Sequence, residues 1–130
     1  MKRAFLLAAL LALPQPVFAS ANLDCAAKDK NVASLVIEAI TSRDGKYLDN
    51  LRGELEIEPG KTIELSRQDV KSHHSEKNIA MHFVKQTPQG LAEIRIYAKP
   101  VGDGDLEYEG TYVVRVGKIQ KGGKVACTAG

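Results

Sequence analysis

Three histidines and a methionine lie within ten positions of one another, in the segment KSHHSEKNIAMHF (71–83). Imidazole nitrogen is a ligand for copper, zinc and nickel, and a thioether favours copper(I). A loop that folds back onto His82 would bring His73 or His74 to the same ion, with Glu76 or Asp69 as an added ligand. The segment therefore supports a copper or zinc site on His73, His74 and His82 as an alternative function.

The pattern around these histidines favours a plainer interpretation. Neighbouring residues of a strand point to opposite faces, so Met81 and His82 cannot both reach one ion from a regular strand. Met81 shares its face with Phe83, which predicts a core position. No ligand spacing here matches a closed structural zinc site. We therefore expect no cofactor, with His73 and His74 in a solvated loop and His82 half-exposed on a strand.

Two other segments imitate known ligand-binding loops. Gly60-Lys61-Thr62 copies the end of a phosphate-binding loop, but the glycine required five positions earlier is Leu55, so we predict a hairpin turn. In GDGDLEYEG (102–110), carboxylates alternate with other residues, but a calcium loop needs glycine at its sixth position, where Tyr108 stands. We predict a turn, followed by a strand whose solvent face carries Glu107 and Glu109.

The sequence has few residues in patterns typical of catalytic sites, and we therefore expect no enzymatic activity. No serine occupies a Gly-x-Ser-x-Gly turn, and every histidine lies in one ten-residue window. A nucleophile and its base would have to come from that window, with Ser66, Ser72 or Ser75 as the nucleophile. The chain has no tryptophan and only 5% aromatic residues, which argues against a sugar-stacking cleft.

The first residues have the pattern of an export signal. Lys2 and Arg3 precede a ten-residue apolar run (4–13), too short to span a bilayer, and prolines and small residues follow. Cleavage would remove residues 1–19 or 1–21 and leave a single domain, 22–130, for the periplasm. The residues before Cys25 lack the small side chains that precede a lipid-modified cysteine, so we expect no lipid anchor and no membrane span.

The charge balance excludes one class of partner. The chain has 18 Lys and Arg against 16 Asp and Glu, and Lys2 and Arg3 supply the whole excess. The exported chain would be formally neutral, with no basic run interleaved with aromatics. We therefore expect no binding to nucleic acid.

Cys25 and Cys127 are the only cysteines, and they stand near the two ends of the exported chain. In an oxidising compartment such a pair favours one disulfide. By the chain-entropy argument, a loop of about 100 residues would gain roughly 4–5 kcal/mol.

A helix is predicted near the start of the domain. Five apolar residues follow the i, i+3, i+4, i+7 spacing of one helical face: Val32, Leu35, Val36, Ala39 and Ile40. Asp29 or Asn31 would cap the helix start and Gly45 would end it. A strand over Leu35–Ile40 is the alternative, because the run is short and β-branched.

After that segment the hydrophobic period changes to two. Alternation predicts strands over residues 54–58, 62–65, 78–86, 91–98, 106–118 and 124–127, with turns at 59–60, 87–90 and 122–123. One helix followed by five or six strands predicts an α+β fold. The helix would pack on an antiparallel meander closed by the disulfide.

This layout, with Cys25 opening a helix and Cys127 closing the last strand in VACTAG (125–130), resembles small exported proteins of the colicin M immunity and YebF-like kind. Their cystatin-like fold wraps an antiparallel sheet around a helix. The resemblance implies a protein that works by binding another protein.

The function predicted from the sequence is a periplasmic protein-binding module, such as an inhibitor or immunity factor that blocks its partner sterically. Binding residues concentrate on loops held by a rigid scaffold. The predicted contact loops are the two longest polar connections, 71–77 and 100–105. Their candidate contact residues are His73, His74, Glu76, Asp103 and Asp105.

Overall fold

The computed structural model describes residues 20–42, 47–75, 77–102 and 106–130. In chain order, its elements are β1 (Ser20–Ala27), β2 (Ser34–Ser42), β3 (Leu48–Glu56), β4 (Thr62–Ser66), the short 3₁₀ helix η2 (Arg67–Asp69), β5 (Val70–His74), β6 (Ile79–Thr87), β7 (Gly90–Pro100), β8 (Glu107–Val116) and β9 (Ile119–Ala129).

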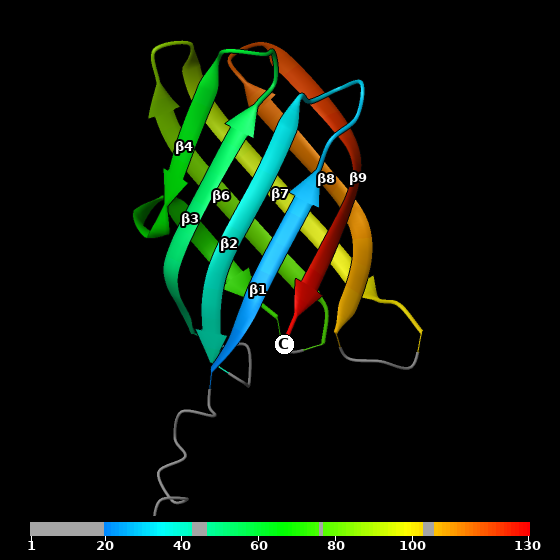
Figure 1. Ribbon diagram of the computed structural model, residues 1–130. Helices are drawn as coiled ribbons and strands as arrows, with labels where there is room; N and C mark the ends of the chain where they lie inside the picture. Colours follow the sequence, from blue (N-terminus) through cyan, green and yellow to red (C-terminus); the bar gives the residue numbers. More distant parts are fainter. Residues whose placement is uncertain (1–19, 43–46, 76, 103–105) are drawn as a thin grey trace, which may run out of the picture.

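All nine strands belong to one antiparallel sheet with the order β4-β3-β2-β1-β9-β8-β7-β6-β5. The first and last strands, β1 and β9, are neighbours in its middle. The sheet is rolled so that its two ends approach each other, which gives a nearly closed, barrel-like shape (Figure 1). Every other neighbouring pair is consecutive in the chain, so the β1–β9 pair alone requires distant segments to meet.

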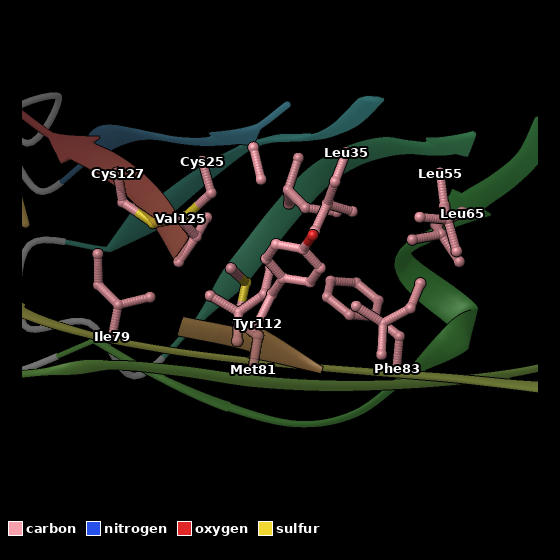
Figure 2. Close-up of a cluster of buried hydrophobic side chains, with 14 of the residues drawn as sticks. Cys25, Leu35, Leu55, Leu65, Ile79, Met81, Phe83, Tyr112, Val125 and Cys127 are labelled. Carbon is pink, nitrogen blue, oxygen red and sulfur yellow. A yellow bond between two sulfur atoms is a disulfide. The ribbon is translucent and has the colours of Figure 1, made fainter. Parts of the chain in front are cut away.

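The interior of the rolled sheet is filled by alternate side chains. In β7, Ala92, Ile94, Ile96 and Ala98 are buried, whereas the intervening side chains are exposed or half-buried. Figure 2 shows labelled side chains from β2–β4 pointing toward Met81, Phe83 and others from β6, with Tyr112 between them. This alternation is the period of two that the sequence predicted for these strands.

The predicted helix is wrong. Residues 34–42 form strand β2, in which Leu35, Ile37, Ala39 and Thr41 point inward. The helical spacing arose because the outward residues Val36 and Ile40 are also apolar, each 37% exposed. β-Branched residues in a short run favour a strand. Among the described residues no helix is long and apolar enough to cross a bilayer.

The predicted α+β architecture is therefore wrong as well, and so is the helix-centred layout that the resemblance implied. Cys25 lies in β1, a strand that the sequence did not predict. Asp29, the expected helix cap, instead accepts backbone N–H bonds from Asn31 and Val32 in the β1–β2 loop. Gly45, the expected helix end, lies outside the described residues.

Two further local predictions need correction. The loop expected at 71–77 begins as strand β5, which ends at His74. The last hairpin turns at Gly117 and Lys118, where Gly117 has φ +59°, rather than at Gly122-Gly123, which lie within β9. Single glycines or glycine pairs within strands permit close backbone approach as well as turns, so composition alone could not locate this turn.

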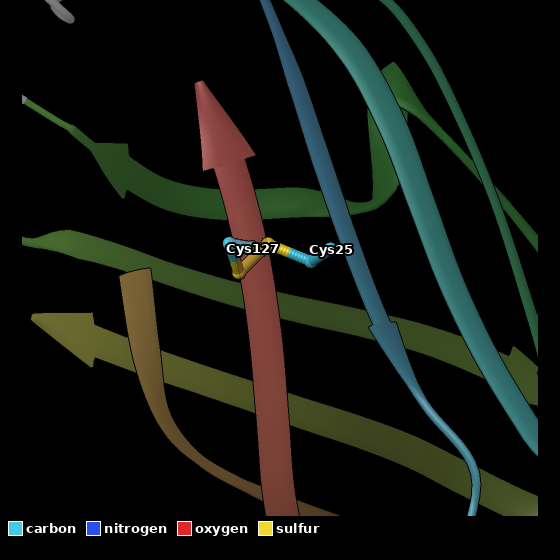
Figure 3. Close-up of a disulfide and its surroundings, with 2 residues drawn as sticks. All are labelled: Cys25 and Cys127. Carbon is cyan, nitrogen blue, oxygen red and sulfur yellow. A yellow bond between two sulfur atoms is a disulfide. The ribbon is translucent and has the colours of Figure 1, made fainter. Parts of the chain in front are cut away.

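The predicted disulfide is confirmed. Cys25 and Cys127 face each other directly in the β1–β9 register, with their Cα atoms 4.0 Å apart. Both side chains are buried, and the bridge lies between the two neighbouring strands (Figure 3). The bridge joins strands near opposite ends of the chain, 102 residues apart in sequence.

Candidate functional site

The three histidines lie on two adjacent strands but not on one side of the sheet. His73 is directly opposite Met81, a core residue, so it points toward the interior. His74 is opposite Ala80, and His82 is opposite Ser72, so these side chains point outward. The structure therefore places His74 and His82 on one face and His73 on the other.

His82 belongs to a charged cluster on the outer face. Its Nε2 lies 2.7 Å from Oε2 of Glu93, which is on the neighbouring strand β7. Two guanidinium groups also contact Glu93: Arg95 Nη2 lies 3.1 Å from Oε2 and Arg115 Nη1 lies 3.4 Å from Oε1. Arg115 in turn donates to the side-chain oxygen of Gln120 on β9, at 2.9 Å. The cluster thus crosses four strands, β6 to β9.

The hydrogen bond from His82 and the two nearby arginines lower the pKa of Glu93. An ionised carboxylate can only accept hydrogen bonds, so the shared proton resides on Nε2 of His82. The other ring nitrogen, Nδ1, is then an acceptor when the ring is neutral and a donor when it is protonated.

A shallow hollow of about 380 Å³ lies beside this cluster, on the outer face of β5–β8. Its polar and aromatic walls include His74, His82 and Tyr97, and Val113 adds an apolar surface. Tyr97 and Val113 are 43% and 40% exposed, so both present apolar or aromatic surface on this face. Asn78 Nδ2 donates to the Tyr97 hydroxyl at 2.8 Å, which fixes the position of the ring.

His82 and Glu93 could act as the base and the acid of a nucleophile–base–acid set, and the nucleophile would then have to be Ser72. Ser72 is directly opposite His82 in the register, and Cβ atoms of such pairs are about 4.5–5.5 Å apart. Within the described residues, however, the Ser72 hydroxyl makes no hydrogen bond to His82. The His82–Glu93 pair is thus anchored to arginines rather than to a nucleophile.

The metal-site prediction can be compared with these positions. In the described part of the chain, no three His, Cys, Asp or Glu side chains are grouped closely enough to hold an ion. His73 Nε2 is buried without a hydrogen-bond partner, and burial lowers the pKa of this histidine. The copper or zinc site stays a prediction, and it would require the side chain of His73 to cross from one face of the sheet to the other.

The remaining predicted positions divide into two groups. Glu76, Asp103 and Asp105 lie outside the described residues. Glu107 and Glu109 are on the exposed face of β8, and Gly60-Lys61 is in the β3–β4 turn, so these two predictions are confirmed.

Sequence reasoning missed Glu93, Arg95, Tyr97 and Arg115. A signal for the first three was present, because the buried alternation of β7 requires them to share the opposite face. What the sequence lacked was the register that sets Glu93 beside Arg115 and Arg95 beside His82.

No protein-family model matches this chain, and no curated protein or solved structure shows significant similarity to it. The functional argument therefore depends on the site alone.

Proposed function

We propose that this chain is an exported protein-binding module whose contact surface is the outer face of β5–β8. The observation that carries this proposal is the grouping of Arg95, Tyr97 and Val113 around one hollow, with Arg115 beside it on Glu93. Tyrosine and arginine dominate the energetics of protein interfaces, especially where they surround a pocket that a partner's side chain can fill.

Charge indicates which kind of partner side chain this surface would accept. Arg95 lines the hollow and Arg115 lies beside it, and both are bound to Glu93. The other carboxylates of this face, Glu107 and Glu109 on β8, do not line the hollow, so the charged groups at the hollow itself are hydrogen-bond donors. A partner that presents a carboxylate next to an apolar or aromatic side chain would satisfy both the arginines and the hollow.

Rigidity supports the same proposal. The contact residues project from the middle of paired strands, and strand positions hold side chains more firmly than loops do. Less ordering entropy is then lost on binding. Steric occlusion of a partner's surface is the mechanism that we propose for such a rigid face.

The test uses the disulfide-intact exported chain, immobilised and exposed to periplasmic extract. Arg95→Glu and Tyr97→Ala are the test variants. Arg52→Glu is the matched control, because it reverses one exposed charge on β3, where Arg52 is within 3.9 Å of Glu38. Thermal unfolding first checks that all variants fold.

We expect a defined partner to bind the wild type and Arg52→Glu at the same affinity. Arg95→Glu and Tyr97→Ala should each weaken binding by tenfold or more, the effect of losing an interface hot spot. A partner that binds all four proteins equally, or that loses affinity equally for the control, would refute the assignment of this face.

A further inference from the structure

A second hollow has a volume of about 480 Å³. The turns that line it lie at the end of the rolled sheet opposite the C-terminus (Figure 1). Three hairpin turns form it: β3–β4, β6–β7 and β8–β9. Two of these turns touch, because the Gly117 amide donates to the Leu91 carbonyl at 3.2 Å. A Cβ at Gly117 would approach the Gln89 carbonyl oxygen to 2.8 Å, so glycine allows the turns to pack closely.

The floor of this hollow is apolar. Val116 is buried, and Ile57 and Ile63 are half-buried against the core. Ile119 forms part of the wall and is 46% exposed. Four aliphatic side chains therefore line a space that no other part of the described chain fills.

The rim of the hollow has two lysines, Lys61 and Lys118, and one acidic residue, Glu58. Lys118 has no acidic partner among the described residues. Lys61 is 3.7 Å from Glu58, but both side chains are largely exposed and such pairs contribute little. The rim therefore has a net positive charge.

We propose that this hollow, which we call the mouth site, binds a small amphipathic anion. The apolar part of the ligand lies on Ile57, Ile63, Val116 and Ile119, and its carboxylate lies between Lys61 and Lys118. The volume is in the range of small-molecule sites, which combine an apolar lining with a few polar groups. This site lies away from the β5–β8 face, and its function is independent of partner binding there.

The probe is 11-(dansylamino)undecanoic acid, a fluorescent fatty-acid analogue, compared with its uncharged methyl ester. The disulfide-intact chain is titrated with each compound below the concentration at which they form micelles. We expect saturable one-to-one binding of the acid with a fluorescence increase, and weaker binding of the ester.

Two substitutions separate the charge from the apolar surface. Lys118→Glu should weaken binding of the acid roughly tenfold and leave the ester unchanged, because it reverses a single rim charge. Ile119→Ser should weaken both compounds, because it removes exposed apolar surface without disturbing the core. Lys99→Glu is the control, a charge reversal at the far end of β7.

Equal affinity for acid and ester, or an unchanged affinity in Lys118→Glu, would overturn the proposal. So would non-saturable binding, or an effect of Lys99→Glu as large as that of Lys118→Glu. Arg95→Glu should leave probe binding intact, so the failure of one proposal can be distinguished from the failure of the other.

Discussion

The rolled sheet has two joints of opposite character. At the first, β1 and β9 pair over four register positions and the Cys25–Cys127 bridge joins them. At the second, β4 and β6 approach without forming a ladder, and β5 pairs only with the first part of β6. There the Lys85 ammonium donates to the Glu64 carbonyl across the gap.

The difference follows from sequence separation. Bringing β1 to β9 closes a loop of about 100 residues, which costs more entropy than closing a short connection. That joint has a disulfide and an antiparallel ladder of four paired positions. At the second joint, only η2 and β5 separate β4 from β6 in the chain. In η2, Ser66 and Asp69 cap the turn, and Arg67 Nε donates to the Leu48 carbonyl at 3.0 Å.

The β1–β9 joint is also stabilised by hydrogen bonds that connect the β1–β2 loop to β8 and β9. The Tyr112 hydroxyl, on β8, donates to the Asp29 carboxylate in the β1–β2 loop at 2.9 Å. Gly123 leaves room for this contact, since a Cβ there would approach the Asp29 Oδ2 to 2.3 Å. Asn31 Nδ2 also donates to the Gly122 carbonyl at 2.6 Å. We therefore expect mutations at the two joints to lower the free energy of unfolding by different amounts.

The largest effect is expected for the double variant Cys25→Ala/Cys127→Ala. Loss of a bridge over about 100 residues should lower the free energy of unfolding by about 4–5 kcal/mol. Urea denaturation at neutral pH measures it, and reduced wild type should match the variant. A loss below about 1 kcal/mol would mean that the β1–β9 ladder alone holds this joint.

Tyr112→Phe should lower the free energy of unfolding by about 1.5–3 kcal/mol, the range for a hydrogen bond to a charged group. Burial, then the Asp29 hydrogen bond, raises the pKa of Tyr112 to about 12. The unfolded state loses this proton near pH 10, so wild-type stability should be complete below pH 10 and fall between pH 10 and 12.

The free energy of unfolding, measured from pH 8 to 12, tests the hydrogen bond between Tyr112 and Asp29. The part of the decline that belongs to Tyr112 should disappear in Tyr112→Phe, whereas Tyr47→Phe, at an exposed site, should leave the wild-type profile unchanged. Identical profiles for wild type and Tyr112→Phe would contradict the role of the Asp29 contact.

At the open joint, Lys85→Met should cost only about 0.5–1 kcal/mol, because one side-chain hydrogen bond is lost. Hydrogen exchange of β4 amides should accelerate, while β1 and β9 amides keep their protection. Lys71→Met, on the exposed face of β5, is the control. Equal acceleration in β9 would show that the two joints open together.

The smallest effect concerns His73, also on the open side. Burial, aided by His74 and Arg67, lowers the pKa of His73 below its usual 6.5. The unfolded state therefore takes up a proton first as pH falls through about 6.5, and stability should decrease from there. His73→Leu should reduce this loss by about 0.5 kcal/mol between pH 7.5 and 5.5, because the half-buried ring is partly screened. Urea denaturation at these pH values measures the loss, and a wild-type slope in His73→Leu would contradict the assignment.

The alternation of apolar and polar residues correctly predicted the buried side chains of β6 and β7. Alternation in β6 and β7 correctly identified Met81, Phe83, Ile94 and Ile96 as core, because a half-buried strand must alternate. In β2 the same reasoning failed, because apolar residues on both faces imitate the spacing of a helix. Here only the strand neighbours, β1 and β3, decide between the two structures.

The sequence by itself determined which side chains of β6 and β7 share a face, and it determined the one disulfide, since a chain with two cysteines allows a single intramolecular pairing. The tertiary structure alone decided that residues 70–74 pair with β6 as a strand rather than forming a loop, and that His82, Glu93 and Arg115 meet. Side-chain direction along a strand is a local property of the backbone. Register between strands depends on packing across the whole core, which a single segment does not encode.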